Sequence, residues 1–421
     1  AVEGVTICLM CGRIQGGVVM DAFVSRRALI SSVGLVAMSA GLGACGTSGG
    51  RSADISGSDS SAKSAEQKPL VQQKLESMTL EQKVAQLFVV TPEQLTGVSQ
   101  AVVAGSATQR ALDDIPVGGL CYFAQNITGD QQLQDLLSGT YDMASRSGAG
   151  IAPFLAVDEE GGSLVARVAN SGYFDVPCFP NMAEVGATGD VAQVAHVGAT
   201  IGEYLHKIGF NVDFAPVADV LTNPCNEVIG PRAFSSDPDV AAQMVSAEVS
   251  AMLDAGTMPC IKHFPGHGDT AGDSHTGAVV SMRSAEEIRT CEYKPFQAGI
   301  EAGCPFVMVG HIETPNLAAD GLPASLSKTM ITDELRGRLG FEGVVISDSF
   351  VMGAITQRYS PADVAVRFIR AGGDVVLMPE NLQDAYRGLL EAVDEGAIEE
   401  QRIDESVKRI LEVKKRAGIL A

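Results

Sequence analysis

The stretch DVAAQMVSAEVSAMLDAGTMPCIKH, residues 239–263, contains a helix-strand unit that indicates the fold. Apolar residues in Asp239–Ala255 recur with the spacing of an amphipathic helix, whereas Cys260–His263 is a short β-type run. The same order follows directly, with a helical pattern at Ser284–Ala302 and a β-rich run at Phe306–Val309. Strands that alternate with helices predict a parallel sheet.

This alternation continues on both sides of the quoted stretch. The residues Thr79-Leu80-Glu81-Gln82 form a capping box, and further helical patterns cover Val191–Ile208 and Ile403–Leu420. Eight strand-helix units favour a single (β/α)8 barrel of the TIM type. The alternative is an open doubly wound sheet, but no Gly-x-Gly-x-x-Gly follows the first strand, which weakens a dinucleotide-binding fold. The predicted strands are Leu87–Val90, Gly119–Phe123, Pro153–Val157, Val212–Val217, Cys260–His263, Phe306–Val309, Val344–Ile346 and Val375–Met378.

The composition is that of an acidic globular protein. Hydrophobic residues make up 46% and charged residues 19% of the 421 residues, enough to fill a large core. The 51 acidic and 30 basic residues give a formal net charge of −21, which argues against a nucleic-acid partner. There is no Trp, and aromatic residues make up 5%, so the chain offers few stacking platforms. A small pocket with polar contacts therefore fits better than a long open groove.

The N-terminal segment has the pattern of a processing signal. Arg26-Arg27 precede the apolar stretch Ala28–Gly43, which is too short to span a membrane, and Leu42-Gly43-Ala44-Cys45 follows. This end resembles a bacterial lipobox, in which the Cys carries the lipid; a plain secretory signal or an N-terminal anchor is the alternative. We expect upstream residues and a lipoprotein signal in 1–44, lipidation of Cys45, a flexible tether in 45–68 and the barrel in 69–421. The protein is then expected outside the cytoplasm, held at the bacterial membrane only by its lipid.

Ionisable residues stand at the ends of several predicted strands. Barrel enzymes carry their chemistry at the carboxyl ends of the strands, because these ends and the loops after them share one face. Several such residues on one rim indicate a converging site, although strand ends that simply meet water are the alternative. The residues are Asp158, Asp219, Lys262, His263, His311 and Asp348.

The densest of these segments is KHFPGHGDTAGDSH, residues 262–275, which holds three of the six His residues. Gly and Pro make it a shaped loop, and because His titrates near neutrality, His275 is a candidate general acid and base. Asp273 stands two residues earlier, where it can orient the imidazole. His and Asp are also metal ligands, so a metal-dependent hydrolase is an alternative, although no His-Glu-x-x-His signature is present.

Together these motifs resemble glycoside hydrolase family 3, and specifically its β-N-acetylhexosaminidase branch. The resemblance runs from about Met78 to the C-terminus. Its longest motif also separates this branch from the β-glucosidases of the family, which lack the Asp-Ser-His. The four motifs are Asp158-Glu159-Glu160-Gly161-Gly162 with Arg167 one residue further on than is usual, Asn211 to Asn226 with Ile229 to Phe234, Lys262 to His275, and Ile346-Ser347-Asp348-Ser349.

The resemblance implies a role for each motif residue. Asp348 would be the nucleophile of a retaining hydrolase that removes terminal β-linked N-acetylglucosamine, His275 its acid and base, and Asp273 the dyad partner of His275. No cofactor and no metal are implied, and the substrate would come from peptidoglycan fragments or other amino-sugar glycans. A β-glucosidase-type hydrolase of the same family and a non-catalytic sugar-binding lipoprotein are the alternatives. The expected sugar-binding residues are Asp158, Arg167, Arg232, Lys262 and His263.

Overall fold

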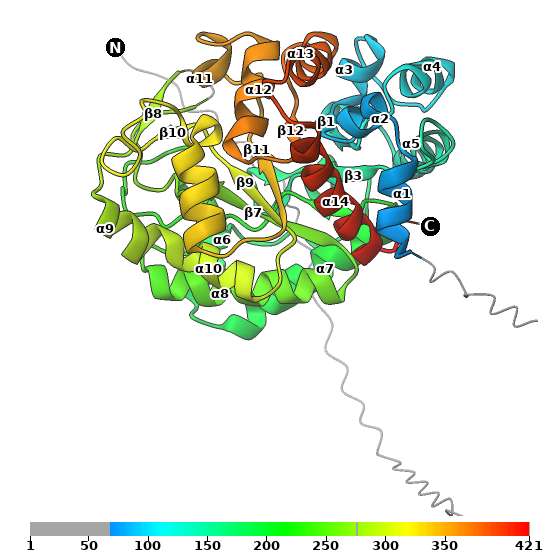
Figure 1. The fold of residues 1–421 in the computed structure, drawn as a ribbon. Helices are drawn as coiled ribbons and strands as arrows, with labels where there is room; N and C mark the ends of the chain where they lie inside the picture. The colour runs from blue at the N-terminus through cyan, green and yellow to red at the C-terminus, as the bar shows by residue number, and fades with distance from the viewer. Residues whose placement is uncertain (1–67, 275–276, 421) are drawn as a thin grey trace, which may run out of the picture. The chain divides into compact units, whose positions relative to one another are not determined.

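The computed structural model describes residues 68–274 and 277–420. Within these residues eight parallel strands form one sheet (Figure 1): β1 (Phe88–Val90), β2 (Gly119–Tyr122), β3 (Phe154–Val157), β6 (Val212–Asp213), β7 (Met258–Phe264), β9 (Phe306–Val309), β11 (Val344–Ser347) and β12 (Val376–Leu377). Their order in the sheet follows the chain, and β12 pairs with β1. A bridge between Ile346 and Val375 joins the β11 and β12 segments, so the sheet closes on itself. The predicted (β/α)8 barrel is confirmed.

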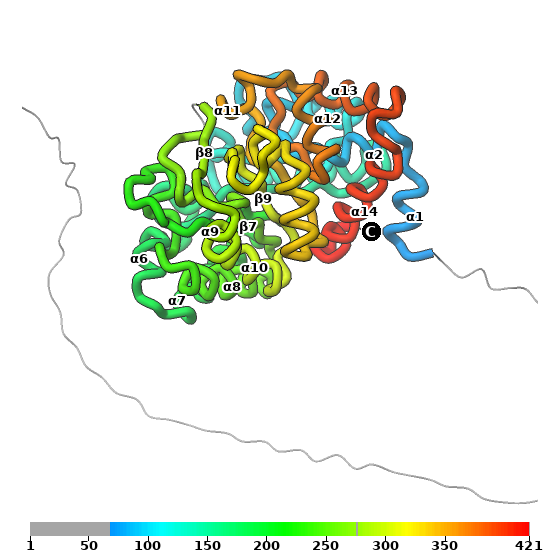
Figure 2. Tube along the Cα trace, turned by 60° about the vertical axis from the view of Figure 1, so that its left-hand side comes forward, coloured from blue at the N-terminus to red at the C-terminus, as the bar shows by residue number. Residues whose placement is uncertain are grey.

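Helices connect the strands and surround the barrel in both views (Figures 1 and 2). Because they cover the outer face of every strand, the strands are buried on both sides, as parallel sheets require. The α-helices are α1 (Leu70–Ser77), α2 (Leu80–Ala85), α3 (Pro92–Thr96), α4 (Ser106–Asp114), α5 (Asp130–Ala144), α6 (Met182–Ala187), α7 (Val191–Ile208), α8 (Pro238–Asp254), α9 (Ala285–Glu287), α10 (Tyr293–Glu301), α11 (Gly353–Thr356), α12 (Pro361–Ala371), α13 (Leu382–Asp394) and α14 (Glu400–Arg416). Two π-helices, η4 (Ile288–Glu292) and η6 (Thr329–Arg338), occur as well, and η6 connects β9 to β11.

The predicted helix Ile403–Leu420 is observed at Glu400–Arg416, and the predicted helix Ser284–Ala302 is divided into α9, a π-helical segment and α10. Helix α7 has the predicted bounds, and Thr79 forms the predicted capping box at α2. Strand β6 ends at Asp213, four residues before the predicted end at Val217. Pro216 has no N–H for the sheet ladder, and pairing resumes after it at a bridge between Val217 and Lys262. The strand is therefore interrupted, but its direction continues to the rim.

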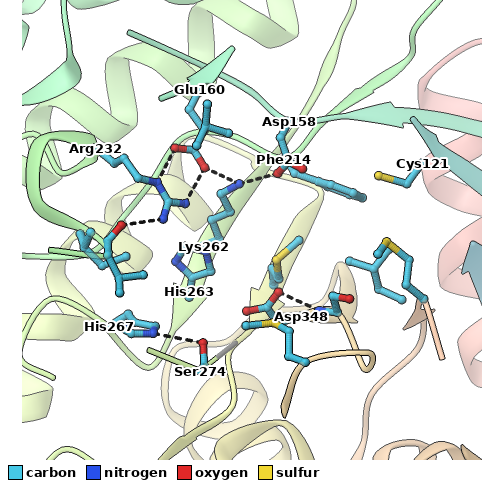
Figure 3. A pocket seen from close by; sticks show the side chains of 18 of the residues that line it. Cys121, Asp158, Glu160, Phe214, Arg232, Lys262, His263, His267, Ser274 and Asp348 are labelled. Atoms are coloured by element: carbon cyan, nitrogen blue, oxygen red, sulfur yellow. Dashed lines mark hydrogen bonds and ion pairs between the residues drawn. The ribbon is translucent and has the colours of Figure 1, made fainter. Parts of the chain in front are cut away.

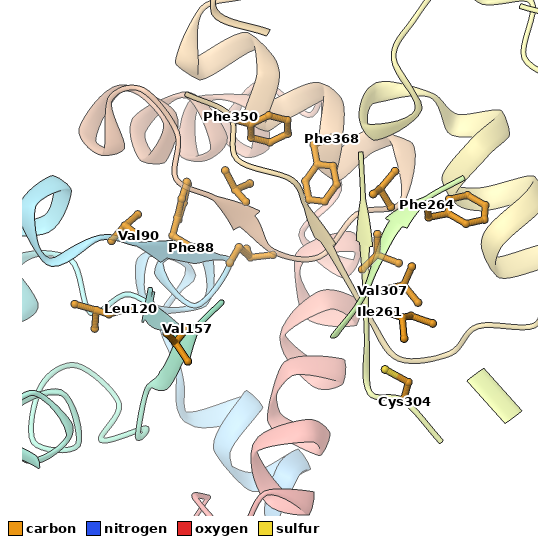
Figure 4. Packing of buried hydrophobic residues seen from close by; sticks show 14 of the residues in the cluster. Phe88, Val90, Leu120, Val157, Ile261, Phe264, Cys304, Val307, Phe350 and Phe368 are labelled. Carbon is orange, nitrogen blue, oxygen red and sulfur yellow. The ribbon is translucent and has the colours of Figure 1, made fainter. Parts of the chain in front are cut away.

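Side chains alternate along each strand between the barrel interior and the layer beneath the helices. In β1, Val89 belongs to the interior cluster, whereas Phe88 and Val90 pack outward. In β7, Cys260 lies inside and Ile261 outside. Figure 4 shows part of the outer layer, in which side chains of neighbouring strands meet those of the helices. Both faces are apolar along most of the strands, which explains why these strands appear in the sequence as short continuous apolar runs.

Helix α14 fills the amino-terminal end of the barrel, and α1 lies beside it in both views (Figures 1 and 2). Ile410 and Val413 belong to the interior cluster. Next to them, Lys414 donates from Nζ to Gln86 Oε1 (2.8 Å) and to the carbonyl of Gly118 (2.9 Å). Burial lowers the pKa of Lys414 to about 7. With this end filled, the carboxyl ends of the strands form the open end of the barrel.

The predictions for the N-terminal segment fall outside the described residues. The signal peptide, Cys45 and the tether up to residue 67 belong to residues 1–67, so they stay predictions. In the part of the chain that is described, no helix is long and apolar enough to cross a membrane.

Candidate active site

A cavity of about 350 Å³ opens at the carboxyl ends of the strands (Figure 3). Its floor is apolar, because it consists of interior side chains of the barrel such as Cys121, Phe214 and Met308. Its polar lining residues come from the end of β7, from β4 and from the segments that follow the other strands. Six of the predicted site residues line this one cavity: Asp158, Arg167, Arg232, Lys262, His263 and Asp348.

Four charged side chains form a cluster on one wall of the cavity. Lys262 Nζ lies 2.7 Å from Asp158 Oδ1 and 2.6 Å from Glu160 Oε1. Arg232 donates two hydrogen bonds to Glu160, from Nε and from Nη2, each 2.7 Å long. The side chains of Lys262 and Glu160 are 3% and 2% exposed, but that of Asp158 is 18% exposed and therefore faces the cavity. Two acidic and two basic groups make the cluster electrically neutral, which offsets the cost of burying it.

The cluster keeps Glu160 and Lys262 ionised. Burial acts to raise the pKa of Glu160, but the nearby charges of Lys262 and Arg232 outweigh burial and lower this pKa to about 2. Burial likewise acts against the charge of Lys262, yet Asp158 and Glu160 together raise the pKa of Lys262. Glu160 was not among the predicted site residues. It stands in a quoted motif, but its pairing with two distant basic residues leaves no local signal in the sequence.

Glu159, the glutamate next to Glu160 in the sequence, holds neighbouring segments in place. Glu159 begins a small antiparallel hairpin, β4 (Glu159–Gly161) and β5 (Val165–Ala166), above the rim. Its carboxylate accepts hydrogen bonds from the N–H of Val168 (2.7 Å) and from the hydroxyl of Tyr204 (2.7 Å). Glu159 therefore holds the end of the hairpin against α7.

Arg167 is carried to the cavity by this hairpin. Its guanidinium lies over the ring of Phe123, with its central carbon 5.7 Å from the ring centroid. Its backbone N–H donates to the carbonyl of Asp158 (3.3 Å). Arg167 thus lines the cavity although its spacing from Asp158 is one residue longer than is usual in the motif.

Asp219 anchors the end of β7, which carries Lys262 and His263, and the loop that follows it. Its Oδ1 accepts hydrogen bonds from the backbone N–H of His263 (3.2 Å) and of His267 (2.7 Å). Its Oδ2 lies 2.7 Å from His263 Nδ1, which fixes the plane of that imidazole. His267 also lines the cavity, with its Nδ1 2.7 Å from the Thr270 hydroxyl oxygen and its Nε2 3.4 Å from Ser274 Oγ. Asp219 and His267 therefore shape the loop, and His263 presents its other edge to the cavity.

Asp348 follows β11 directly and lines the opposite part of the cavity (Figure 3). Its Oδ1 accepts from the N–H of Ser349 (2.7 Å). Burial acts to raise the pKa of Asp348, but His263, His311 and this hydrogen bond outweigh burial and lower it. His311 Nε2 lies 2.9 Å from the carbonyl of Ser349, so it also holds the turn in place. Asp348 is therefore an ionised carboxylate beside an apolar floor.

The end of the loop at residues 262–275 reaches the Asp348 side of the cavity. Ser274 is buried, and its carbonyl accepts from the N–H of Ala354, 3.1 Å away in α11. Asp273 lies next to Ser274, on the wall of an adjoining cavity. His275, the predicted acid and base, lies outside the described residues. Within residues 68–274 and 277–420 no group of three or more His, Cys, Asp or Glu side chains is arranged to hold a metal ion.

A closed (β/α)8 barrel with a small carboxylate-bearing pocket at its C-terminal rim defines a barrel enzyme. The family described as "Glycosyl hydrolase family 3 N terminal domain" matches residues 79–413, and the chain belongs to this family. A β-hexosaminidase of Stenotrophomonas maltophilia is 36% identical over 65% of this chain and 80% of its own length. Beta-hexosaminidase A of Pseudoalteromonas piscicida is 33% identical over 71% of this chain and 53% of its own length.

Solved structures agree with this assignment. A family 3 β-N-acetylglucosaminidase from Paenibacillus sp. str. FPU-7 matches with a TM-score of 0.76 and 35% identity, over 82% of this chain and 64% of that one. A β-N-acetylhexosaminidase from Beutenbergia cavernae matches with a TM-score of 0.70 and 28% identity, over 80% of this chain and 99% of that one. The chain thus spans between half and two thirds of the Pseudoalteromonas and Paenibacillus relatives, and nearly all of the Beutenbergia structure.

Proposed function

We propose that this protein is a retaining β-N-acetylhexosaminidase that removes terminal β-linked N-acetylglucosamine. The observation that carries the proposal is Asp348, a carboxylate kept ionised at the edge of a pocket with room for about one sugar residue. An anionic carboxylate needs no base to act as a nucleophile at neutral pH. The relatives given above are named β-hexosaminidases, a β-N-acetylglucosaminidase and a β-N-acetylhexosaminidase, and these names support N-acetylglucosamine as the sugar that is removed.

In the proposed reaction, Asp348 attacks the anomeric carbon and forms a covalent glycosyl-enzyme. His275 protonates the leaving oxygen and then takes a proton from the water that releases the sugar, with Asp273 orienting the imidazole. Retaining enzymes ordinarily use two carboxyl groups for these tasks. A His in place of the second carboxyl is cationic when it acts as the acid and neutral when it acts as the base. It therefore never places another anion beside Asp348, which would raise the pKa of the nucleophile.

The charged cluster is proposed to bind the hydroxyls of the sugar. Asp158 faces the cavity, where its second oxygen can accept a hydrogen bond from a hydroxyl of the sugar. The ammonium of Lys262 has three N–H donors, and two of them point to Asp158 and Glu160. The third can donate a hydrogen bond to the sugar. Arg232 is held by Glu160, and Arg167 and His263 line the same wall. Hydrogen bonds to ionised groups are stronger than neutral ones, which suits a small polar ligand.

The location of the protein is also proposed, from its N-terminal sequence alone. Lipidation at Cys45 would tie the barrel to the outer face of a bacterial membrane through residues 45–68. There, peptidoglycan fragments or other amino-sugar glycans would supply the substrate. Metabolic labelling with a fatty-acid analogue tests this, because Cys45→Ser should remove the label and release the protein from the membrane fraction. Label retained on the Cys45→Ser protein would contradict it.

The experiment that tests the activity is hydrolysis of an aryl N-acetyl-β-D-glucosaminide by the protein and by its Asp348→Ala and His275→Ala variants. We expect an active wild type and a loss of more than about 1,000-fold in kcat/KM for Asp348→Ala. The matched aryl β-glucoside should be a poor substrate. If all three proteins behave alike, the nucleophile is wrong, and if the glucoside is preferred, the protein is a β-glucosidase-type member of the family.

A further inference from the structure

The loop that follows β7 is held near its start and at its end, and His267 takes part in both attachments (Figure 3). Near the start, the backbone N–H of His267 donates to Asp219 Oδ1 over 2.7 Å. At the end, Ser274 Oγ lies 3.4 Å from Nε2 of the same His267. The carbonyl of Ser274 also accepts a hydrogen bond from the N–H of Ala354 in α11. His267 and Ser274 are each 2% exposed, so the contact between them is shielded from water.

The hydrogen bonds of Thr270 determine which nitrogen of His267 carries the proton. The hydroxyl of Thr270 has one proton and lies 2.9 Å from the carbonyl of His267, which can only accept it. Nδ1 of His267, 2.7 Å from the same hydroxyl oxygen, therefore donates its own proton to Thr270. Burial outweighs the carboxylates of Asp219 and Asp348 and lowers the pKa of His267, so the imidazole is neutral. Its Nε2 then carries a lone pair and accepts a hydrogen bond from the hydroxyl of Ser274.

This hydrogen bond holds the residue that precedes the proposed acid. Ser274 is followed directly by His275 in the sequence, and consecutive Cα atoms are about 3.8 Å apart. Ser274 is attached through its hydroxyl to His267 and through its carbonyl to α11. Two residues after the acid in the sequence, the N–H of Gly277 donates to the carbonyl of Asp273 over 3.3 Å. A displacement of Ser274 would therefore displace the acid as well.

We propose that His267 is a positioning residue for the acid of the reaction, which rests on the function proposed above. Nδ1 of His267 is bound to Thr270 and Nε2 to Ser274, so neither nitrogen is left to bind the sugar or to exchange a proton with it. The imidazole acts through Ser274 alone. Because small displacements of reacting groups are costly, loss of this contact should slow the protonation of the leaving oxygen.

The test compares two aryl N-acetyl-β-D-glucosaminides whose leaving groups differ in their need for a proton. Phenol has a pKa of about 10, as the Tyr side chain does, and leaves poorly unless it is protonated, whereas 2,4-dinitrophenol is acidic enough to leave as its anion. In His267→Ala we expect kcat/KM to fall about 10- to 100-fold for the phenyl glycoside and less than about threefold for the dinitrophenyl glycoside. An equal fall for both substrates would overturn the proposal, because loss of folded enzyme or of sugar binding lowers both alike.

Two gentler variants keep the test decisive if His267→Ala does not fold. Ser274→Ala removes only the hydroxyl and should reproduce the selective loss on the phenyl glycoside. His267→Gln keeps a side-chain acceptor for Ser274 and should stay within about threefold of the wild type on both substrates. A Ser274→Ala protein that hydrolyses the phenyl glycoside as fast as the wild type would overturn the proposal.

A double-mutant cycle shows whether the two side chains act through one contact. The variant that combines His267→Ala with Ser274→Ala should lose no more activity on the phenyl glycoside than the worse single variant, and additive losses would overturn the proposal. Ser250→Ala is the control, because this hydroxyl is exposed on α8, and its removal should leave both rates unchanged. Absence of hydrolysis of both substrates by the wild type would instead overturn the proposed function, and this inference with it.

Discussion

Asp348 and Glu160 show how the same physics gives two carboxylates different tasks. Both are ionised because nearby basic or hydrogen-bonding groups outweigh the effect of burial on their pKa. Glu160 accepts two hydrogen bonds from Arg232 and one contact from Lys262, and its side chain is only 2% exposed, so it is buried behind the basic groups. Among the described residues, Asp348 accepts one hydrogen bond, from the backbone N–H of Ser349 to Oδ1, and its carboxylate lines the cavity. The number of partners, and not the charge, distinguishes the nucleophile from the structural carboxylate.

The lowered pKa of Asp348 predicts the pH dependence of the activity. Asp348 must be ionised to react, and its pKa lies below the ordinary value of 3.8, so the nucleophile is ready throughout the range above about pH 5. The proposed acid, His275, must be protonated for the first step, and a His ordinarily titrates near neutrality. We expect kcat/KM to be highest on the acidic side of neutrality and to fall along an alkaline limb that the titration of His275 sets.

The measurement is kcat/KM for the aryl substrate across about pH 4 to 9. His275→Ala supplies the control, because its residual rate should lose the alkaline limb. A profile for the wild type that stays flat from about pH 5 to 8 would count against a His acid.

At the scale of elements, the site depends on two segments whose backbone N–H groups donate hydrogen bonds to buried carboxylates. The hairpin of β4 and β5 is held by Glu159, and the end of β7 with the loop that follows it is held by Asp219. The sequence predicted that polar residues would converge at the rim, because every parallel strand ends there. Which carboxylate binds backbone and which one faces the cavity depends on loop conformation, and no periodic pattern encodes that.

Asp219 should matter through the loop it holds. Asp219→Ala removes the acceptor of the N–H groups of His263 and His267 and the partner of the His263 imidazole. Because small displacements of reacting groups are costly, we expect kcat to fall about 100-fold. Asp219→Asn keeps a carbonyl oxygen for the two N–H groups and should retain most of the activity. Comparable losses in both variants would show that the charge of Asp219, and not its hold on the loop, is what the reaction needs.

At the scale of the whole molecule, the barrel carries a buried acid that opposes its own stability at neutral pH. Glu248 on α8 is 1% exposed, and both of its carboxylate oxygens lack a partner among the described residues. It packs against α7 where Gly198 leaves room, since a Cβ there would lie 2.9 Å from Glu248 Cγ. Burial, with a smaller contribution from Glu160, raises the pKa of Glu248 from 4.5 to about 8.

This shift predicts how stability changes with pH. Between about pH 4.5 and 8 the folded protein keeps the proton on Glu248 and the unfolded chain releases it, so the free energy of unfolding falls as the pH rises. Glu248→Gln cannot titrate and removes this slope. Relative to wild type, the variant should therefore gain stability from pH 4.5 to 8, by on the order of a few kcal/mol.

Denaturant unfolding at several pH values measures this difference. Glu395→Gln is the control, because Glu395 is exposed and its replacement should leave the pH slope unchanged. If the free energies of unfolding of wild type and Glu248→Gln change in parallel between pH 4.5 and 8, Glu248 is not protonated in the folded protein.

The amino-acid sequence by itself determined the order of strands and helices, the closed barrel and the rim on which the polar residues gather. Each of these follows from short-range patterns: apolar runs buried on two faces, helical spacing between them, and polar residues where strands end. The strand predictions differ from the structure mainly at β6, where Pro216 interrupts the ladder.

Tertiary structure alone decided which charges meet. Arg232 and Glu160 are 72 residues apart in the chain, and Lys262 and Asp158 are 104 apart. It also decided that Glu159 turns to the hairpin and Glu160 to the cluster, and that Lys414 fills the base of the barrel. Local propensity acts over a few residues, whereas an ion pair acts through space, so these partners are set only when the barrel closes.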